Sequence, residues 1–352
     1  MRFMRALFIV NSSEIIGSGH FSRCTNLALY MRKFGWEIIF LSTDLLSNHQ
    51  KILVSHEIKY LVVPKSDLGS KEEILRMLDS SFTKSEKEMF DWLIIDDYDI
   101  GPNIIKDAYK YSKKLLRIED LHVARWDCDL VLDMNYRSMQ YKTDYLNCYQ
   151  IEKILVGPDY ALLDSRFEFL HSQVIANLIN ETEIVNVFLN FGSLDVNSLT
   201  LRMLRILIEE FQELSVKIVI QESNVDLLEI QEVVTQNSHR CKLYVSPDFL
   251  GEIMASCSVS IGAGGISIWE RFSVGLTGLV VSTANNQKVP MEQLAHDGYI
   301  SFLGQADEVQ DEQLLAELSK VLALLNNGRG HRLDLVDGRG VQRVYERMMK
   351  VV

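Results

Sequence analysis

The sequence predicts an α/β protein made of two doubly wound domains, each built around a parallel sheet. In the first half of the chain, short apolar runs alternate with longer amphipathic stretches, a pattern typical of a sheet covered by helices on both faces. The same alternation begins again with IVNVFLNFGS at 184–193. A polar stretch separates the two halves, so we expect the domain boundary near 160–182.

Apolar runs predict the strands of the first half, and the amphipathic stretches between them predict helices. The predicted strands lie at 6–10, 37–42, 60–64, 91–97, 115–120 and 129–135. The predicted helices lie at 21–35, 45–57, 70–78 and 101–114.

The second half repeats this pattern. Its predicted strands lie at 184–193, 216–221, 241–245, 259–265 and 277–283, and its predicted helices at 197–212, 225–237, 311–328 and 340–352. We therefore expect a Rossmann-type domain at 1–165, a second at 180–330 and a C-terminal helix within 331–352. The cleft between two such domains is the expected binding site, because strand carboxyl ends and helix N-termini face it.

Composition narrows the function. The 352 residues carry a net charge of −12, with a sequence pI near 5.2. This argues against a nucleic-acid-binding protein, although a local site can still bind a small anion. The first apolar run is too short for a signal peptide and no run reaches a membrane-spanning length, so we expect no stable membrane insertion.

The cysteines indicate a cytoplasmic protein with reduced thiols, because their number is odd and no pair has metal-ligand spacing. They are Cys24, Cys128, Cys148, Cys241 and Cys257.

The turn after the first strand is a candidate catalytic corner. In NSSEIIGSGHFSRCTNLAL at 11–29, Gly17 and Gly19 let the backbone bend sharply and approach a ligand. His20 is expected at the helix start, where the dipole favours a neutral imidazole that can accept a proton. A base beside an anion-binding helix end suits attack near a phosphate leaving group. The alternative is that His20 only caps the helix and packs.

A second candidate stretch, IGAGGISIWERF at 261–272, runs from a strand into a helix. Gly264 and Gly265 leave backbone N–H groups open to a diphosphate, and a carboxylate at Glu270 can accept hydrogen bonds from a ribose diol. The alternative for Glu270 is an interaction with the helix dipole alone. No lysine follows the glycines, which argues against a P-loop.

Three further polar stretches end predicted strands. Asn286 and Gln287 offer amide groups to the cleft, or else form a polar loop. Asp97 and Asp99 have the D-x-D spacing of some metal-dependent transferases, but capping of the strand end is the preferred interpretation. Asp195 either faces the cleft or belongs to a turn and helix cap.

Six stretches, taken in order, resemble the UDP-sugar hydrolases of the pseudaminic acid pathway (PseG-type) and the related spore-coat and flagellin-modification proteins. They are SSEIIGSGHFSRCTNLA at 12–28, IIDDYDI at 94–100, RIEDLHVARWDCDLVLD at 117–133, GPDYALL at 157–163, IGAGGISIWERFSVGL at 261–276 and ANNQ at 284–287. That family is similar to the MurG-type glycosyltransferases, so the resemblance implies a GT-B fold, with two Rossmann-type domains facing a central cleft.

The resemblance also implies residue roles. His20 would be the catalytic base, activating a water molecule that attacks the anomeric carbon. Glu270 would bind the ribose, and Tyr98 would line the sugar pocket. Gly264 and Gly265 would hold the diphosphate, and Asn286 and Gln287 would contact the sugar or phosphate. The other substrate-binding residues implied are Gly17, Gly19, Arg23 and Asp195. The family uses no metal for the chemistry, and we expect no cofactor.

The chain departs from the family pattern in three places. Where the family has F-G-G-S-D-P-x-N-L-T, this chain has FGSLDVNSLT at 191–200. The residues at 193, 194, 196 and 198 differ from the family pattern, and Asp195 is kept. Asp164 and Arg166 reverse the charge order of the family's Y-A-L-L-R-x-E-F, which could preserve an ion pair, and Asn11 replaces an aspartate. Either the substrate differs from the family's, or the chain has changed toward transfer.

The resulting hypothesis is hydrolysis of a UDP-linked diacetamido-trideoxyhexose to UDP and free sugar, with the small-molecule UDP-sugar as the partner. The alternative is a GT-B glycosyltransferase that moves an activated amino sugar to an acceptor hydroxyl. A non-catalytic nucleotide-sugar binder is disfavoured, because His20 and its glycines are intact.

Overall fold

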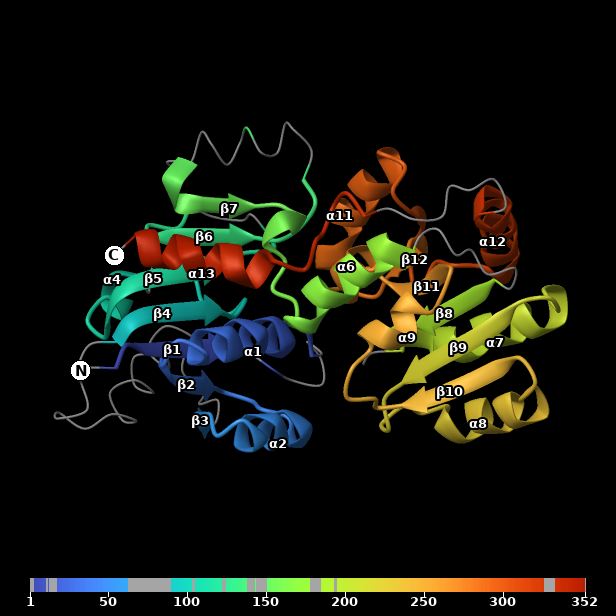
Figure 1. The fold of residues 1–352 in the computed structure, drawn as a ribbon, viewed down its shortest axis with the longest axis horizontal. Helices are drawn as coiled ribbons and strands as arrows, with labels where there is room; N and C mark the ends of the chain where they lie inside the picture. The colour runs from blue at the N-terminus through green and yellow to red at the C-terminus, as the bar shows by residue number, and fades with distance from the viewer. Residues whose placement is uncertain are drawn as a thin grey trace. The chain divides into compact units, whose positions relative to one another are not determined.

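The computed structural model of the chain divides into two compact units (Figure 1). The first comprises Met1–Leu162 together with Gly340–Val352, and the second comprises Leu163–Arg339. The structure describes residues 3–10, 12, 18–62, 90–102, 105–121, 125–137, 143, 151–177, 185–192, 195–325 and 333–351. The predicted helix at 70–78, Gly17 and Cys148 lie outside this part of the chain.

The first unit is built on a seven-stranded sheet in the order β3-β2-β1-β4-β5-β6-β7. Every neighbouring pair is parallel. The strand order reverses between β1 and β4, and ligands of such sheets bind at this switch point, outside the carboxyl ends of the strands. The strands are β1 (Arg5–Val10), β2 (Glu37–Ser42), β3 (Lys59–Val62), β4 (Phe90–Asp96), β5 (Ser112–Ile118), β6 (Leu130–Asp133) and β7 (Ile154–Val156).

Apolar strand runs explain why this sheet forms. Every residue from Ala6 to Val10 in β1 is buried, and so is every residue from Trp92 to Asp96 in β4. Strands covered on both faces read as continuous apolar runs, as these do. The helical elements of the unit are α1 (Gly19–Arg32), α2 (Ser47–Ser55), α4 (Ile105–Ala108), η2 (Ile151–Lys153), η3 (Pro158–Tyr160) and α13 (Gly340–Lys350).

The C-terminal helix α13 belongs to the first unit. It lies beside α1 on the same face of the sheet (Figure 1), where Tyr345 stacks on Phe34 with ring centroids 4.7 Å apart. Its first residue, Gly340, lies against the backbone of Ala161, and a Cβ at Gly340 would come within 2.2 Å of that carbonyl oxygen.

The second unit repeats the architecture with six parallel strands in the order β10-β9-β8-β11-β12-β13. Its switch point lies between β8 and β11. The strands are β8 (Asn186–Asn190), β9 (Ser215–Ile220), β10 (Cys241–Val245), β11 (Val259–Ala263), β12 (Gly278–Ser282) and β13 (Ser301–Gln305). The helical elements are α6 (Arg166–Asn177), η4 (Val196–Ser198), α7 (Leu199–Glu210), α8 (Leu227–Gln236), α9 (Gly251–Ala255), α10 (Ser267–Ser273), α11 (Asn285–His296) and α12 (Asp311–Leu325).

The two doubly wound sheets predicted from the sequence are confirmed, with local corrections. The predicted helix at 101–114 is wrong at its end, because Ser112 and Lys114 pair with β4 and belong to β5. Strand pairing there overrides the local pattern. The sequence pattern does not predict β7, α6, α11 or β13. Helix α11 carries Pro290 in its interior, which is unusual in a helix.

Two observations concern cysteines and membranes. Cys24, Cys128, Cys241 and Cys257 are buried thiols without disulfides. Within the described ranges, no helix combines the length and the apolar character needed to cross a bilayer.

We expect Gly262→Ala, in β11, to destabilise the second unit by about 1–3 kcal/mol, because overpacking costs that much in a close-packed interior. A Cβ at Gly262 would lie 2.1 Å from the backbone oxygen of Asn190, which cannot move without disturbing β8. Gly265→Ala is the matched control, since its Cβ would meet only Gln287 Nε2 at 3.5 Å. Urea unfolding of the two variants measures the difference, and equal stability would contradict this explanation.

Candidate functional site

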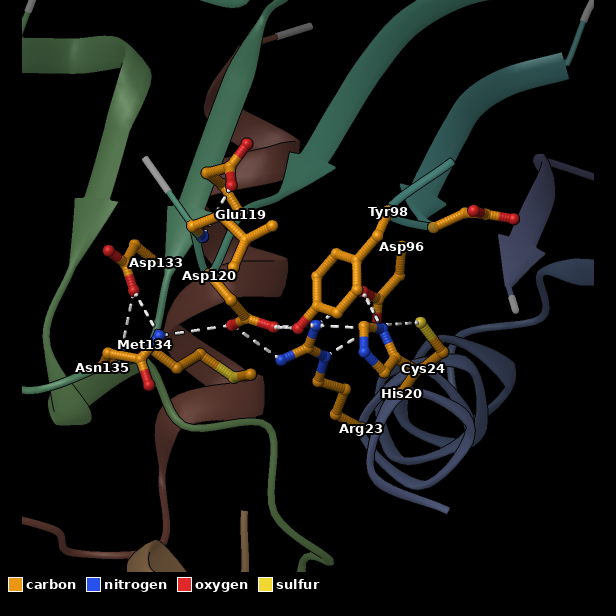
Figure 2. A network of polar contacts seen from close by, with 12 residues as sticks. His20, Arg23, Cys24, Asp96, Tyr98, Glu119, Asp120, Asp133, Met134 and Asn135 are labelled. Atoms are coloured by element: carbon orange, nitrogen blue, oxygen red, sulfur yellow. Dashed lines mark hydrogen bonds and ion pairs between the residues drawn. The ribbon is translucent and has the colours of Figure 1, made fainter. Parts of the chain in front are cut away.

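The switch point of the first sheet brings His20 and Asp96 together. Val10, which ends β1, is paired with Asp96, which ends β4. His20 is the second residue of α1, the helix that follows β1, and it lies at the end of β4 (Figure 2). Both side chains are buried. The predicted corner is therefore formed by two adjacent parallel strands and the first turn of one helix.

Asp96 orients the His20 ring. His20 Nδ1 lies 2.6 Å from Asp96 Oδ1 and 3.2 Å from Arg23 Nη2. Because the carboxylate contact is the shorter one, we assign the ring proton to Nδ1, which donates to Asp96. No hydrogen bond joins Nε2 to any residue that the structure describes. In this tautomer, Nε2 is the basic nitrogen.

Arg23 binds two carboxylates at once. Its Nε and Nη2 donate to Asp96 at 2.6 and 2.5 Å, and its Nη1 and Nη2 donate to Asp120 at 3.0 and 2.8 Å. Cys24 Sγ also donates to Asp96, at 3.4 Å. Residues three and four apart share one face of a helix, which explains the H-x-x-R-C spacing at 20–24. Arg23 was predicted to bind substrate, and most of its donors here serve these two acids.

The two carboxylates stay ionised because of this arginine. Burial alone would raise the pKa of Asp96, but the charge and hydrogen bonds of Arg23, helped by His20, hold it well below its usual value. Burial opposes ionisation of Asp120 in the same way, and the Arg23 charge lowers the pKa of Asp120 to about 2. Two negative charges and one positive charge therefore lie beside His20.

Asp120 follows β5 and links three strand ends. It accepts the Tyr98 hydroxyl at 2.5 Å and the Asn135 amide at 3.2 Å, as Figure 2 shows. The Tyr98 ring meets the His20 ring edge to face, with centroids 4.5 Å apart. Asp133 accepts the Asn135 amide at 2.9 Å. Tyr98, predicted to line the sugar pocket, thus lies directly against the candidate base.

Three residues of this network received no functional role from the sequence: Asp96, Asp120 and Asn135. Each lies at or just after the end of a buried strand, and carboxyl ends of adjacent parallel strands meet at one sheet edge. That shared position is the signal that could have found them. What the sequence lacked was the strand order, which makes β4, β5 and β6 neighbours.

The remaining predicted residues of this unit have simpler environments. Gly19 begins α1, and a Cβ there would meet no atom within 4 Å, so its backbone has open space. Asp97 Oδ1 accepts the backbone N–H of Asp99 at 2.8 Å, which caps the end of β4. Among the described residues, no group of His, Cys, Asp and Glu is arranged to hold a metal ion.

The second unit places the predicted glycines after β11. A Cβ at Gly264 would lie 2.6 Å from Cγ of Met291 in α11, so a larger residue there would have to displace that side chain, whereas Gly265 faces Gln287 Nε2. Gln287 Oε1 accepts the Thr283 backbone N–H at 2.9 Å, which fixes the start of α11. Asn286 is its half-buried neighbour on α11, so both amides stand on a helix rather than in a loop.

A buried arginine supports the glycine turn from within the unit. Arg271 donates to the carbonyl oxygens of Ala263 and, at 3.2 Å, of Ser267. Burial lowers the pKa of Arg271 to about 10, and Glu270 opposes that shift. Burial, with a smaller contribution from the negative Asp164, raises the pKa of Glu270 to about 7.

Two further predictions concern acids of the second unit. Asp195 accepts the Thr200 N–H at 3.1 Å and the Asn224 amide at 3.0 Å, so both its oxygens hold a turn before α7. Its neighbours Ser193 and Leu194 lie outside the described residues. Asp164 forms an ion pair with Arg166 at 2.7 Å, as the reversed charge order suggested.

The sequence of the chain is similar to those of two known proteins. No family model matches the chain. Its sequence is 23% identical over 306 residues to the spore coat polysaccharide biosynthesis protein SpsG of Bacillus subtilis, a match that spans 82% of this chain and 83% of that protein. It is 24% identical over 282 residues to an uncharacterized protein of Methanocaldococcus jannaschii; this match spans 79% of the chain but only 55% of that protein's length.

Solved structures resemble the whole chain. MurG of Acinetobacter baumannii superposes with a TM-score of 0.65 at 14% identity, covering 99% of this chain and 100% of that one. The UDP-GlcNAc 2-epimerase of Neisseria meningitidis gives 0.63 at 13% identity, with 99% and 100% covered. The chain has a GT-B fold. The fold class predicted from the sequence is therefore confirmed, and at these identities the likeness concerns the fold alone.

We expect Arg23→Met to destabilise the protein by about 3–5 kcal/mol, the usual cost of leaving buried charges without their partner. Asp96 and Asp120 would then face each other without a cation. Arg23→Lys, which keeps the charge but loses the fork that spans both acids, should cost less. Urea unfolding at pH 7 measures both. A loss below 1 kcal/mol for Arg23→Met would mean that this ion cluster contributes little to stability.

Proposed function

We propose that the chain hydrolyses a UDP-linked diacetamido-trideoxyhexose to UDP and free sugar, in the biosynthesis of a pseudaminic-type nonulosonic acid. The observation that carries the proposal is the His20–Asp96 pair at the switch point of the first sheet, in which Nε2 has no hydrogen bond to a residue that the structure describes. The similarity to a spore coat polysaccharide protein and the fold shared with a UDP-GlcNAc epimerase support a nucleotide sugar as substrate. The specific sugar and pathway come from the sequence resemblance.

The first unit would supply the base. His20 Nε2 takes a proton from water as the water oxygen attacks the anomeric carbon, and the bond from that carbon to the UDP oxygen breaks. Asp96 keeps its hydrogen bond to Nδ1 throughout and stabilises the imidazolium that forms, as an aspartate does beside a catalytic histidine. Arg23 and Asp120 would keep Asp96 ionised and fixed, with Tyr98 beside the sugar.

The second unit would hold the nucleotide. Gly265 and Gly264 would allow the diphosphate close to the backbone, and the Glu270 carboxylate would accept the ribose hydroxyls. Gln287 lies against Gly265, so it and Asn286 would contact the phosphate or the sugar. Gly17, Gly19 and Asp195 remain substrate-binding candidates. We propose no metal or cofactor, and a cytoplasmic location fits the buried thiols.

The alternative is a glycosyltransferase, in which an acceptor hydroxyl replaces water beside His20. The likeness to MurG and the altered stretch at 191–200 favour it. The two reactions differ in whether UDP is released without an acceptor. Proton NMR of the protein with a panel of UDP-activated 2,4-diacetamido sugars, in the presence of EDTA, tests this directly. Release of UDP and reducing sugar supports hydrolysis; tight binding without release supports transfer.

We expect His20→Ala to lower turnover by about 10²–10⁴-fold, the usual contribution of a general base. UDP affinity should stay nearly unchanged, because the nucleotide is assigned to the other unit. His56→Ala, at an exposed position after α2, is the control and should keep full activity. If UDP release survives in His20→Ala, the role given to His20 is wrong.

We expect affinity for UDP-GlcNAc, used as a non-titrating probe, to rise with pH through about 7. Burial raises the pKa of Glu270 to about 7, so the carboxylate that would accept the ribose hydroxyls is ionised only above that pH. Each pH unit below the pKa should weaken binding by up to about tenfold. Glu270→Gln, which does not titrate, should remove the dependence. A pH profile that is flat in the unsubstituted protein contradicts the ribose assignment.

A further inference from the structure

A buried serine–histidine pair lies on the other side of the catalytic corner. Ser12, just past β1, places its Oγ 2.5 Å from Nδ1 of His49 on α2. Both residues are almost fully buried. The His49 ring also stacks face to face on Phe21, with centroids 4.0 Å apart and planes 8° from parallel. One imidazole therefore contacts residues at both ends of the connection between β1 and α1.

The chemistry of this contact is defined by the burial of His49. Burial lowers the pKa of His49 to about 4, so the ring is neutral at neutral pH. A serine hydroxyl can donate or accept a hydrogen bond, so it can pair with the neutral ring through Nδ1 in either tautomer. A phenylalanine could fill the same space against Phe21, so the distinctive contribution of the imidazole is its hydrogen bond with Ser12.

The first turn of α1 depends on such tertiary contacts. Ser18, at the helix N-cap, makes no side-chain hydrogen bond to the helix start within the described residues. An N-terminus without a cap is held in place by what packs against it. Asp96 binds one side of the turn through His20, Arg23 and Cys24, while His49 contacts the other side through Phe21.

We propose that His49 is a positioning residue for His20: its hydrogen bond to Ser12 and its stack on Phe21 set the depth and rotation of the first turn of α1 against Asp96. This inference rests on the proposed role of His20. Displacing a catalytic group by about 1 Å can cost about 10²-fold in rate even when binding is intact. The pair would thus act on kcat rather than on nucleotide affinity.

Three variants separate the hydrogen bond from packing. Ser12→Ala removes the hydroxyl, His49→Phe keeps the stack without the ring nitrogen, and His49→Asn restores a hydrogen-bonding group near the Nδ1 position. We expect the first two to lower kcat for UDP-sugar hydrolysis by about 10–100-fold with KM within about threefold. The double variant should be no worse than either alone, and His49→Asn should recover much of the loss. Ser55→Ala, at an exposed hydroxyl on α2, should change nothing.

A second readout does not depend on turnover. Nitrogen-15 NMR of the histidine rings reports whether His20 carries its proton on Nδ1, and that signature should become averaged in Ser12→Ala and His49→Phe. If the unsubstituted protein hydrolyses no UDP-sugar, the proposed function fails, while these spectra still judge the positioning role.

Unchanged His20 signals in Ser12→Ala, in protein with the same circular dichroism, would reduce the pair to core packing and overturn the proposal. Unchanged kcat would do the same wherever activity is measurable. Because Ser12→Ala removes a single hydroxyl, it carries the test even if His49→Phe does not fold.

Discussion

The Arg23 guanidinium lies between two buried carboxylates that end neighbouring strands. Without it, Asp96 and Asp120 could not both remain ionised in a site from which water is largely excluded. With it, the ends of β4 and β5 are tied to the first turn of α1, and the His20 ring takes its orientation from an acid that is itself held by two hydrogen bonds. Arg23 keeps both acids ionised. Ionised Asp96 then accepts the Nδ1 proton of His20, and ionised Asp120 accepts the Tyr98 hydroxyl.

The two units share a topology, but the charged groups at their switch points differ. The switch point of the first sheet gathers carboxylates around a histidine, an arrangement suited to accepting a proton. The corresponding turn of the second sheet has glycines, and its buried arginine binds backbone carbonyl oxygens rather than acids.

The sequence predicted the two sheets and identified His20 as a candidate, but it did not predict the hydrogen-bond network of Asp96, Asp120 and Asn135. Continuous apolar runs identify buried parallel strands, and a glycine-rich turn before a helix marks the His20 corner. A single sequence indicates that Asp96, Asp120 and Asn135 each lie at or just after a strand end, but their meeting depends on strand order, which is a long-range property. The strand signal at 112–114 was likewise hidden, because only pairing with β4 makes that segment extended. Helix α11, which carries Asn286 and Gln287, was not predicted, and its interior Pro290 is unusual in a helix.

Helix α13 packs with the first unit, although it follows the second unit in the sequence. The second unit is one uninterrupted segment, whereas the first is completed only by residues 340–352, which are synthesised after the second unit. During synthesis, the second unit can fold before Tyr345 makes its ring contacts with Tyr30 and Phe34 of the first unit. The unit that carries the candidate base is therefore completed only after the second unit has been made, so a nascent chain that stops before residue 340 would contain a complete second unit and an incomplete first one.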